Sequence, residues 1–247
     1  VPGLIAGIYQ RDQVEVDLFD LAEQAGVALM VAEIRGLDLH NQELRLDQRP
    51  ALAYERLSLN LGAVTPPSQY ETPGLVPIKP LEPALAFLAD QDRQMLNPTL
   101  AAEPFLVVGS GLAAMETVLA LRQRWPRRPL ELQIRPEQLK PALIRALREA
   151  AIQIHETDQR EPKEQFEQIP GLLCSGSRAP LWLTDTGLPC CPSSGRIRTE
   201  TSLQVIGHPT LFAAGDCAVV DTKPRAPSGV WAVRAATPLA RNLEAAC

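Results

Sequence analysis

The sequence predicts an α/β fold with a parallel sheet, and two features indicate it. Segments typical of strands and helices alternate through the middle of the chain, and the first strand–helix junction is rich in glycine. Alternation of this kind implies a parallel sheet with helical crossovers. The predicted elements are strands over 105–108, 130–135 and 152–157, and helices over 112–125 and 141–151.

Composition limits the classes of protein that remain. The 247 residues are 45% hydrophobic and 21% charged, as expected of a globular chain, and the net charge is −5. A binder of nucleic-acid backbones would need a basic excess to displace counterions, so that class is disfavoured. The apolar stretches are far shorter than the ~20 residues of a membrane helix. Five scattered cysteines indicate a reducing compartment, so we expect a cytoplasmic protein.

Other elements are expected on both sides of this central region. Apolar spacing predicts a helix from Val16 that Gly26 ends, and the density of prolines over 65–83 predicts a stiff connector. The remaining predictions are a strand over 28–34, a hairpin over 36–50, a strand from 57, a helix over 84–96, a strand over 169–177, a loop with a hairpin over 187–199, a strand over 209–217 and a helix over 229–247.

The first strand–helix junction carries a dinucleotide-binding pattern. Gly109, Ser110, Gly111 and Ala114 fill G-x-G-x-x-G/A directly after a strand and at the start of a helix, which is the context that the mechanism needs. Gly109 permits a tight turn, Gly111 lets a pyrophosphate approach the backbone, and Ala114 lets helix and strand pack closely. Amides of the first helical turn would face the phosphates. The alternative is a glycine-rich turn without a ligand.

The second strand of the pattern ends in a cation. An acidic residue usually binds the ribose at this place, but here the strand ends in Arg135. A cation suits a 2′-phosphate, which favours NADPH over NADH. The alternative is that Arg135 is a solvated surface charge.

A second motif lies near the carboxyl end of the chain. The stretch 201–218 (TSLQVIGHPTLFAAGDCA) resembles the second flavin motif of two-domain pyridine-nucleotide flavoproteins. That resemblance implies that Asp216 binds the ribityl chain of FAD and that Gly215 allows close approach. The helix from Gly229 would then point its N-terminus at the flavin. The alternative for Asp216 is a carboxylate that caps a turn.

Further segments extend the resemblance over nearly the whole chain. YERLSLNLGA (54–63) and IPGLLCSGSRAPLWLTDTGLP (169–189) resemble segments of the type II NADH dehydrogenase-like branch of the pyridine nucleotide-disulfide oxidoreductase superfamily. The resemblance implies that Gly176 contacts a cofactor and that Glu116 lies near the nicotinamide, although Glu116 could equally be an exposed helix carboxylate. Within the branch, the chain is similar to a flavoprotein module fused to selenide, water dikinase, which makes a fused dikinase domain a possible partner.

The resemblance implies two Rossmann-like domains with parallel sheets. A discontinuous FAD-binding domain would cover 1–101 and 180–247, and an NAD(P)-binding domain would cover 102–179. The family's first strand–glycine loop–helix unit, which holds the FAD pyrophosphate, is not in this sequence, so we expect an N-terminally truncated FAD domain that binds FAD poorly by itself.

Two substitutions depart from the branch's pattern. Pro227 stands where the branch often has lysine, and Ala235 where it often has glutamine. Both changes remove polar groups near the expected flavin or acceptor site, which puts quinone reduction in doubt.

The function expected from these motifs is hydride transfer from NAD(P)H to FAD, with electrons passed on to an unknown acceptor. One alternative is a catalytically degenerate nucleotide-binding regulatory module. Another is an NAD(P)-dependent oxidoreductase without flavin, in which Asp216 has no role. Metal-ligand spacing is absent, and Cys190 and Cys191 are expected to be ordinary thiols.

Overall fold

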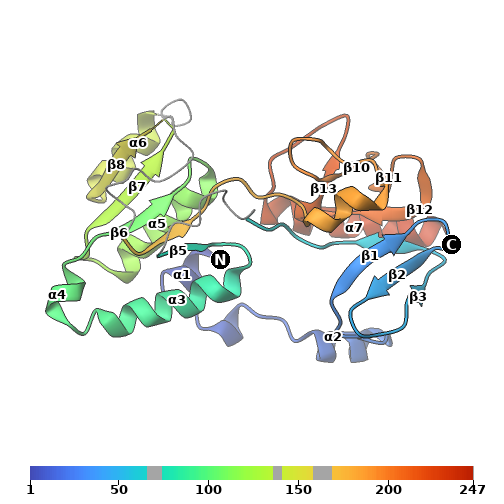
Figure 1. Cartoon of the computed structure of the whole chain (residues 1–247), viewed down its shortest axis with the longest axis horizontal. Coiled ribbons are helices and arrows are strands. Elements are labelled where there is room, and N and C mark those ends of the chain that lie inside the picture. Colours follow the sequence, from blue (N-terminus) through green and yellow to red (C-terminus); the bar gives the residue numbers. More distant parts are fainter. Residues whose placement is uncertain (66–73, 136–140, 158–168, 247) are drawn as a thin grey trace. The chain divides into compact units, whose positions relative to one another are not determined.

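The computed structural model describes residues 1–65, 74–135, 141–157 and 169–246. The described chain divides into two compact units, each assembled from two segments (Figure 1). Unit 1 comprises Val1–Ala25 and Thr65–Gly176, and unit 2 comprises Gly26–Val64 and Ser177–Cys247. These units differ from the predicted cofactor domains, because Val1–Ala25 and the described residues of 74–101 belong with the central α/β region. The cofactor domains themselves stay a prediction.

Unit 1 is built on a five-stranded parallel sheet in the order β5-β9-β6-β7-β8. The predicted alternation of strands and helices is confirmed in every element. The strands are β5 (Leu75–Pro77), β6 (Phe105–Val108), β7 (Leu130–Ile134), β8 (Ile152–Glu156) and β9 (Gly171–Leu173). The helices are α1 (Pro2–Ile5), η1 (Arg11–Gln13), α2 (Leu18–Ala25), α3 (Leu81–Gln94), α4 (Pro98–Ala101), α5 (Leu112–Arg124) and α6 (Pro141–Glu149).

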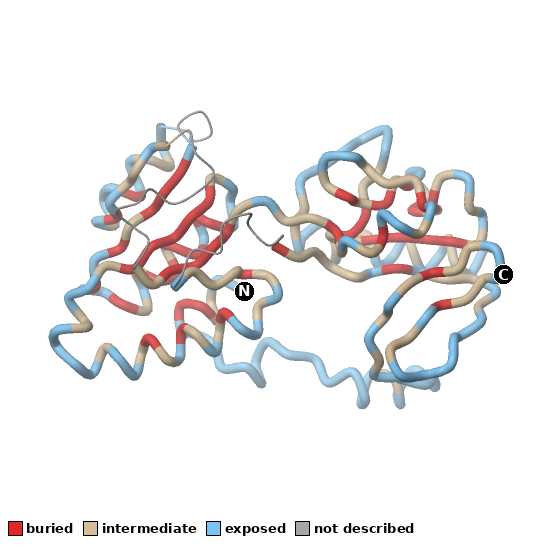
Figure 2. The backbone as a smooth tube through the Cα atoms, in the orientation of Figure 1, coloured by how far each residue is buried: buried red, intermediate tan, exposed pale blue. Residues whose placement is uncertain are grey.

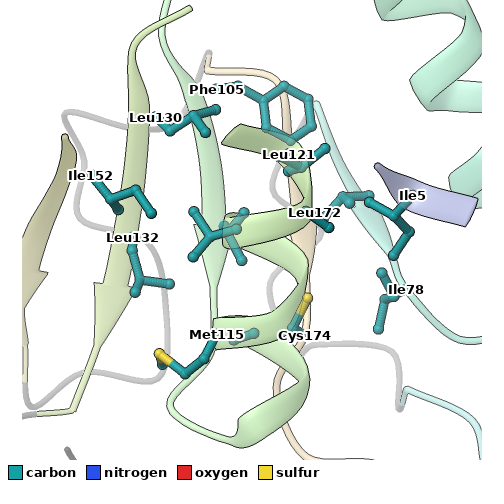
Figure 3. Close-up of a cluster of buried hydrophobic side chains, with 14 of the residues drawn as sticks. Ile5, Ile78, Phe105, Met115, Leu121, Leu130, Leu132, Ile152, Leu172 and Cys174 are labelled. Carbon is teal, nitrogen blue, oxygen red and sulfur yellow. The ribbon is translucent and has the colours of Figure 1, made fainter. Parts of the chain in front are cut away.

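The core of unit 1 forms where α5 covers the sheet. All four residues of β6 are buried, and α5 buries six residues against it (Figure 2). Figure 3 shows side chains from α1, α5, β6, β7, β8 and β9 meeting in this cluster, among them Ile5, Leu121, Leu132 and Leu172. A continuous apolar strand is typical of a parallel sheet that is covered on both faces.

A partly buried polar network ties the helices of unit 1 to one another. Arg124 lies between α1 and α3: its Nη1 donates to the carbonyl of Ile5 at 2.9 Å, and its Nε donates to Asp92 at 3.0 Å. Trp125 Nε1 also donates to Asp92, at 2.8 Å. Burial by itself would raise the pKa of Asp92, but these donors outweigh it and hold the pKa below its ordinary value.

Unit 2 contains two sheets. A five-stranded sheet has the order β13-β10-β11-β12-β4, in which β4 and β12 are parallel and β11 runs antiparallel to both its neighbours. Its strands are β4 (Leu57–Leu59), β10 (Ile197–Thr199), β11 (Gln204–Val205), β12 (His208–Ala213) and β13 (Ala218–Val220). The antiparallel sheet has β1 (Ile34–Asp38), β2 (Glu43–Leu46) and β3 (Leu52–Ala53), and the helices are η4 (Leu181–Thr186), η5 (Gly215–Cys217) and α7 (Gly229–Ala245).

Two sequence predictions are wrong. The strand expected over 28–34 is absent before Ile34, and Val27, Met30 and Val31 are at least half exposed, so an apolar run found no neighbouring strand to pair with. The connector expected over 65–83 contains β5, whose Pro77 is the last residue of an edge strand, where a missing N–H is tolerated. Residues 66–73 of that connector lie outside the described residues.

Candidate functional site

The first glycine of the loop after β6, Gly109, packs tightly against the residue that follows β9 and against α5. Gly109 has φ of +151°, and a Cβ there would lie 2.9 Å from the backbone carbon and oxygen of Cys174. The same Cβ would lie 3.1 Å from the Cβ of Ala114, which is fully buried. Only glycine fits a position with this φ and this backbone approach. Gly109 and Ala114 are therefore in close contact at the junction of strand and helix. The part predicted for them in binding a dinucleotide stays a prediction.

The second glycine is open to solvent. Gly111 caps the N-terminus of α5, and a Cβ built on it meets no atom within 4 Å. Leu112 beside it is 75% exposed, which is unusual for a leucine at the start of a buried helix. The loop thus exposes backbone amides at the positive end of a 13-residue helix, an arrangement suited to an anion.

Hydrogen bonds place Arg135 beside this loop. The backbone N–H of Arg135 donates to Ser110 Oγ at 2.7 Å, and the N–H of Gly109 donates to the carbonyl of Gln133 at 3.0 Å. The ends of β6 and β7 are therefore joined where the predicted cation follows β7. Arg135 is exposed.

Two further predicted site residues of unit 1, Gly176 and Glu116, lie on different elements from the glycine loop. Gly176 follows β9, the strand beside β6, and has φ of +27°. Glu116 is exposed on α5, one turn after the loop. The structure thus gathers Gly109, Ser110, Gly111 and Arg135 at the carboxyl end of the sheet, where ligands of open α/β sheets bind.

Gly215 and Asp216 lie at the corresponding edge of unit 2. They begin η5, which is separated from β12 only by Ala214, and Gly215 has φ of +70°. A Cβ on Gly215 would collide with Oδ1 of Asn60, which follows the neighbouring parallel strand β4. The carboxyl ends of β12 and β4 therefore approach closely at this glycine.

A cavity of about 300 Å³ opens beside Gly215 and Asp216, within unit 2. Its walls come from the ends of β10 and β13, the segment 223–228 and the first half of α7, and they include Pro227 and Ala235. Sequence reasoning missed further lining residues, among them Arg196, Lys223, Arg225, Trp231 and Arg234. The basic residues just before α7 were the available signal for Lys223 and Arg225.

The cysteines differ strongly in their surroundings. Cys217 is buried in the core of unit 2, and its thiol donates to the carbonyl of Ala214 at 3.3 Å. Burial raises the pKa of Cys174 to about 12. For Cys191 the prediction of an ordinary thiol is wrong, because hydrogen bonds from Ser193 and Ser194 lower its pKa to about 7.

Two absences apply to the residues that the structure describes. No cluster of three or more histidine, cysteine, aspartate or glutamate residues could hold a metal ion among them. None of the helices formed by these residues is both long and apolar enough to cross a membrane.

Comparisons by sequence find no relatives: no family model matches the chain, and neither does any curated protein. Comparisons by structure find many. Reduced CoADR-RHD from Bacillus anthracis has a TM-score of 0.81 and 16% identity over 99% of this chain and 49% of its own.

Two further solved structures have a similar fold to this chain. NADH:rubredoxin oxidoreductase from Clostridium acetobutylicum has a TM-score of 0.76 and 16% identity, over 99% of this chain and 64% of its own. An engineered water-forming NADPH oxidase bound to NADPH has a TM-score of 0.77 and 18% identity, over 98% of this chain and 60% of its own. The chain thus has the two-unit, Rossmann-like α/β fold of these reductases and spans between about half and two thirds of their lengths.

Proposed function

We propose that the protein containing this chain is a flavoprotein oxidoreductase that takes a hydride from NAD(P)H onto FAD and passes electrons to an acceptor. One observation carries the proposal. In each unit a strand with a buried carboxyl end, β6 or β12, is followed at once or after one residue by a glycine at positive φ and then by a group suited to a dinucleotide.

In unit 1 the chain's own groups would bind and orient the nicotinamide nucleotide. The exposed amides around Gly111 would donate to the pyrophosphate, helped by the dipole of α5. Arg135, fixed at the loop through its backbone bond to Ser110, would hold a 2′-phosphate, which supports NADPH over NADH. Glu116 and Gly176 would lie toward the nicotinamide end of the site.

In unit 2 the donor set fits part of FAD. Asp216 lines the cavity with a carboxylate that can accept hydrogen bonds from sugar-like hydroxyls, and Gly215 has no side chain to keep a ligand away. The cavity volume of about 300 Å³ suits a portion of the cofactor only. When bound, FAD supplies the two-electron chemistry, and the protein contributes orientation and electrostatics.

The finer parts of the function rest on the sequence resemblance. The pyrophosphate of FAD needs a second glycine loop, and unit 2 has none among its described residues. In these residues β4 pairs on one side only, which leaves a parallel edge where a further strand could add. A fused selenide, water dikinase domain and a cytoplasmic location also stay predictions.

An absorbance spectrum of purified protein tests the proposal. We expect a flavin band in the visible region that bleaches when NADPH or NADH is added without air. Gly111→Val should slow the bleaching at least about tenfold, because its side chain would occupy the space of the phosphates while the fold stays intact. Gly36→Ala, in the β1–β2 hairpin, is the control and should leave the bleaching unchanged.

A catalytically degenerate nucleotide-binding module is the second candidate. Pro227 and Ala235 both line the cavity and give it apolar surface where the branch often has polar side chains. A colourless protein that still binds NADPH would favour this candidate. A protein whose NADPH oxidation survives Asp216→Ala would instead favour an oxidoreductase without flavin.

A further inference from the structure

Ser110 supplies the last hydrogen bond between β6 and β7. The two strands are parallel, and their backbone ladder ends where the N–H of Gly109 donates to the carbonyl of Gln133 at 3.0 Å. In a parallel ladder the next bond would join the N–H of Arg135 to the carbonyl of Gly109. The N–H of Arg135 donates instead to Ser110 Oγ, at 2.7 Å. A side chain of the glycine loop thus takes the place of a backbone carbonyl.

The conformation of Gly109 explains this exchange of acceptors. Its φ of +151° turns the chain out of the sheet and into the loop before α5, so β6 does not continue beside β7. The hydroxyl of the next residue, Ser110, reaches back to the strand end that the backbone has left. A serine hydroxyl can accept a hydrogen bond from a backbone N–H, whereas alanine or glycine at this position would offer no acceptor.

The carboxyl end of β7 is also held from its other side. The N–H of Thr157, directly after β8, donates to the carbonyl of Ile134 at 2.9 Å. Arg135 therefore follows a strand end that is bonded to both neighbouring strands, and Ser110 fixes its own N–H. Ser110 is half-buried and Arg135 is exposed. These bonds fix the backbone of Arg135 and leave its side chain at the surface, where a ligand can reach it.

We propose that Ser110 is a positioning residue that sets the preference for NADPH over NADH through Arg135. The inference rests on the proposed function, in which Arg135 binds the 2′-phosphate of the nucleotide. A long arginine side chain loses conformational freedom when it binds a ligand, and a fixed backbone leaves less of that freedom to be lost. NADH has no 2′-phosphate, so its affinity does not depend on Arg135. Ser110 thus acts through Arg135 and not by contact with the nucleotide.

Isothermal titration calorimetry with the oxidised nucleotides tests this role in the purified protein without turnover. Wild-type protein should bind NADP⁺ more tightly than NAD⁺. Ser110→Ala should weaken the binding of NADP⁺ roughly fivefold and leave that of NAD⁺ unchanged, because it releases only the backbone of Arg135. Ser110→Thr keeps the hydroxyl and should keep the wild-type ratio of the two dissociation constants. Thr99→Ala, which removes an exposed hydroxyl from α4 of the same unit, is the matched control and should change neither constant.

A double-mutant cycle shows whether Ser110 acts through Arg135. Arg135→Ala should weaken the binding of NADP⁺ roughly thirtyfold, because it removes charged hydrogen bonds to the 2′-phosphate. Adding Ser110→Ala to this variant should change the ratio of the two dissociation constants less than about twofold, because the side chain that Ser110 positions is no longer there. Unchanged binding of NAD⁺ in all the variants shows at the same time that the loop is folded.

The outcomes separate this inference from the proposed function. The inference is overturned if Ser110→Ala leaves the ratio unchanged, weakens both nucleotides equally, or acts as strongly in the Arg135→Ala variant as in the wild type. A ratio that Arg135→Ala does not alter refutes the proposed role of Arg135 and the inference with it, as does a wild-type protein that binds neither nucleotide. A protein that binds both nucleotides but has no flavin band refutes only the flavin reaction, and the calorimetry still decides the role of Ser110.

Discussion

The two units use their helices in opposite ways. In unit 1, six residues of α5 are buried against the parallel sheet. In unit 2, none of the 17 residues of α7, all of them described, is buried, and Val230 and Val233 are more than half exposed. Unit 2 forms its core between its two sheets and η4, with Leu183, Ile197 and Leu211.

This difference shows which contacts hold the site in each unit: apolar packing of a helix in unit 1, and polar and cation–π contacts in unit 2. The glycine loop of unit 1 lies at the end of a helix that the sheet holds tightly, so the loop is rigid because the core is. The cavity of unit 2 lies beneath a helix with little apolar contact of its own, so its shape depends on polar and cation–π contacts. Burial contributes far more per residue in the first case than in the second.

The largest expected difference comes from truncating one apolar side chain in each unit. Phe105→Ala should cost about 3–5 kcal/mol, because its ring is fully buried and packs 4.9 Å from the ring of Trp125. Val233→Ala on α7 should stay within about 0.5 kcal/mol. Urea unfolding followed by hydrogen exchange of peptides from each unit measures both. Equal losses would show that α7 is packed as tightly as β6.

The central region of unit 1 was predictable because its signals are local. An apolar strand, a glycine turn and a helix follow one another within 20 residues, and the contact of Gly109 with Ala114 is implied by the motif itself. Adjacent elements in such a region are also adjacent in space.

The missed features depend on pairing between distant segments. β5 pairs with β9, nearly 100 residues later, and proline density hid it. The lining of the cavity joins Arg196 to the segment 223–228. Neither contact has a local sequence pattern, so the sequence showed these residues but not which of them would be neighbours. The low pKa of Cys191 was missed for another reason: Ser193 and Ser194 are close in the sequence, but only the turn that they form brings their hydroxyl groups to the thiol.

A second comparison uses the two glycines that end the central strands. Gly109→Ala should cost about 2–4 kcal/mol, because its Cβ would meet backbone atoms of Cys174 that cannot move away. Gly215→Ala should cost only about 1–2 kcal/mol, mainly for its positive φ, because the atom in its way is the end of the Asn60 side chain. The same unfolding experiment decides, and a larger loss for Gly215→Ala would contradict the comparison.

Removing one ion pair from each unit should give a smaller difference in the free energy of unfolding, and again the larger loss should be in unit 1. Asp92→Asn should cost about 1–2 kcal/mol at pH 7, because it weakens hydrogen bonds from Arg124 and Trp125 in a partly exposed network. Asp221→Asn, which loosens an exposed pair with Arg198 in unit 2, should have little effect.

The contribution of Asp92 should also depend on pH. Because its pKa is lowered on folding, the wild-type advantage is present above the ordinary aspartate pKa of 3.8 and disappears as the pH falls through the lower, folded value. Unfolding curves of wild-type protein and Asp92→Asn should therefore converge in acid. Curves that stay equally separated there would show that Asp92 acts through packing and not through its charge.

The smallest effect concerns the reactivity of one thiol in each unit. Cys191 of unit 2, with a pKa of about 7, should react with iodoacetamide at pH 7, and its rate should fall as the pH drops below that value. Cys174 of unit 1 should not react while the protein is folded. Ser193→Ala should slow Cys191 roughly fivefold at pH 7, because it removes a donor to the thiolate, whereas Ser58→Ala should not. Mass spectrometry of the alkylated peptides measures these rates, and equal rates for Cys191 with and without Ser193 would mean that the serine leaves the pKa of the thiol unchanged.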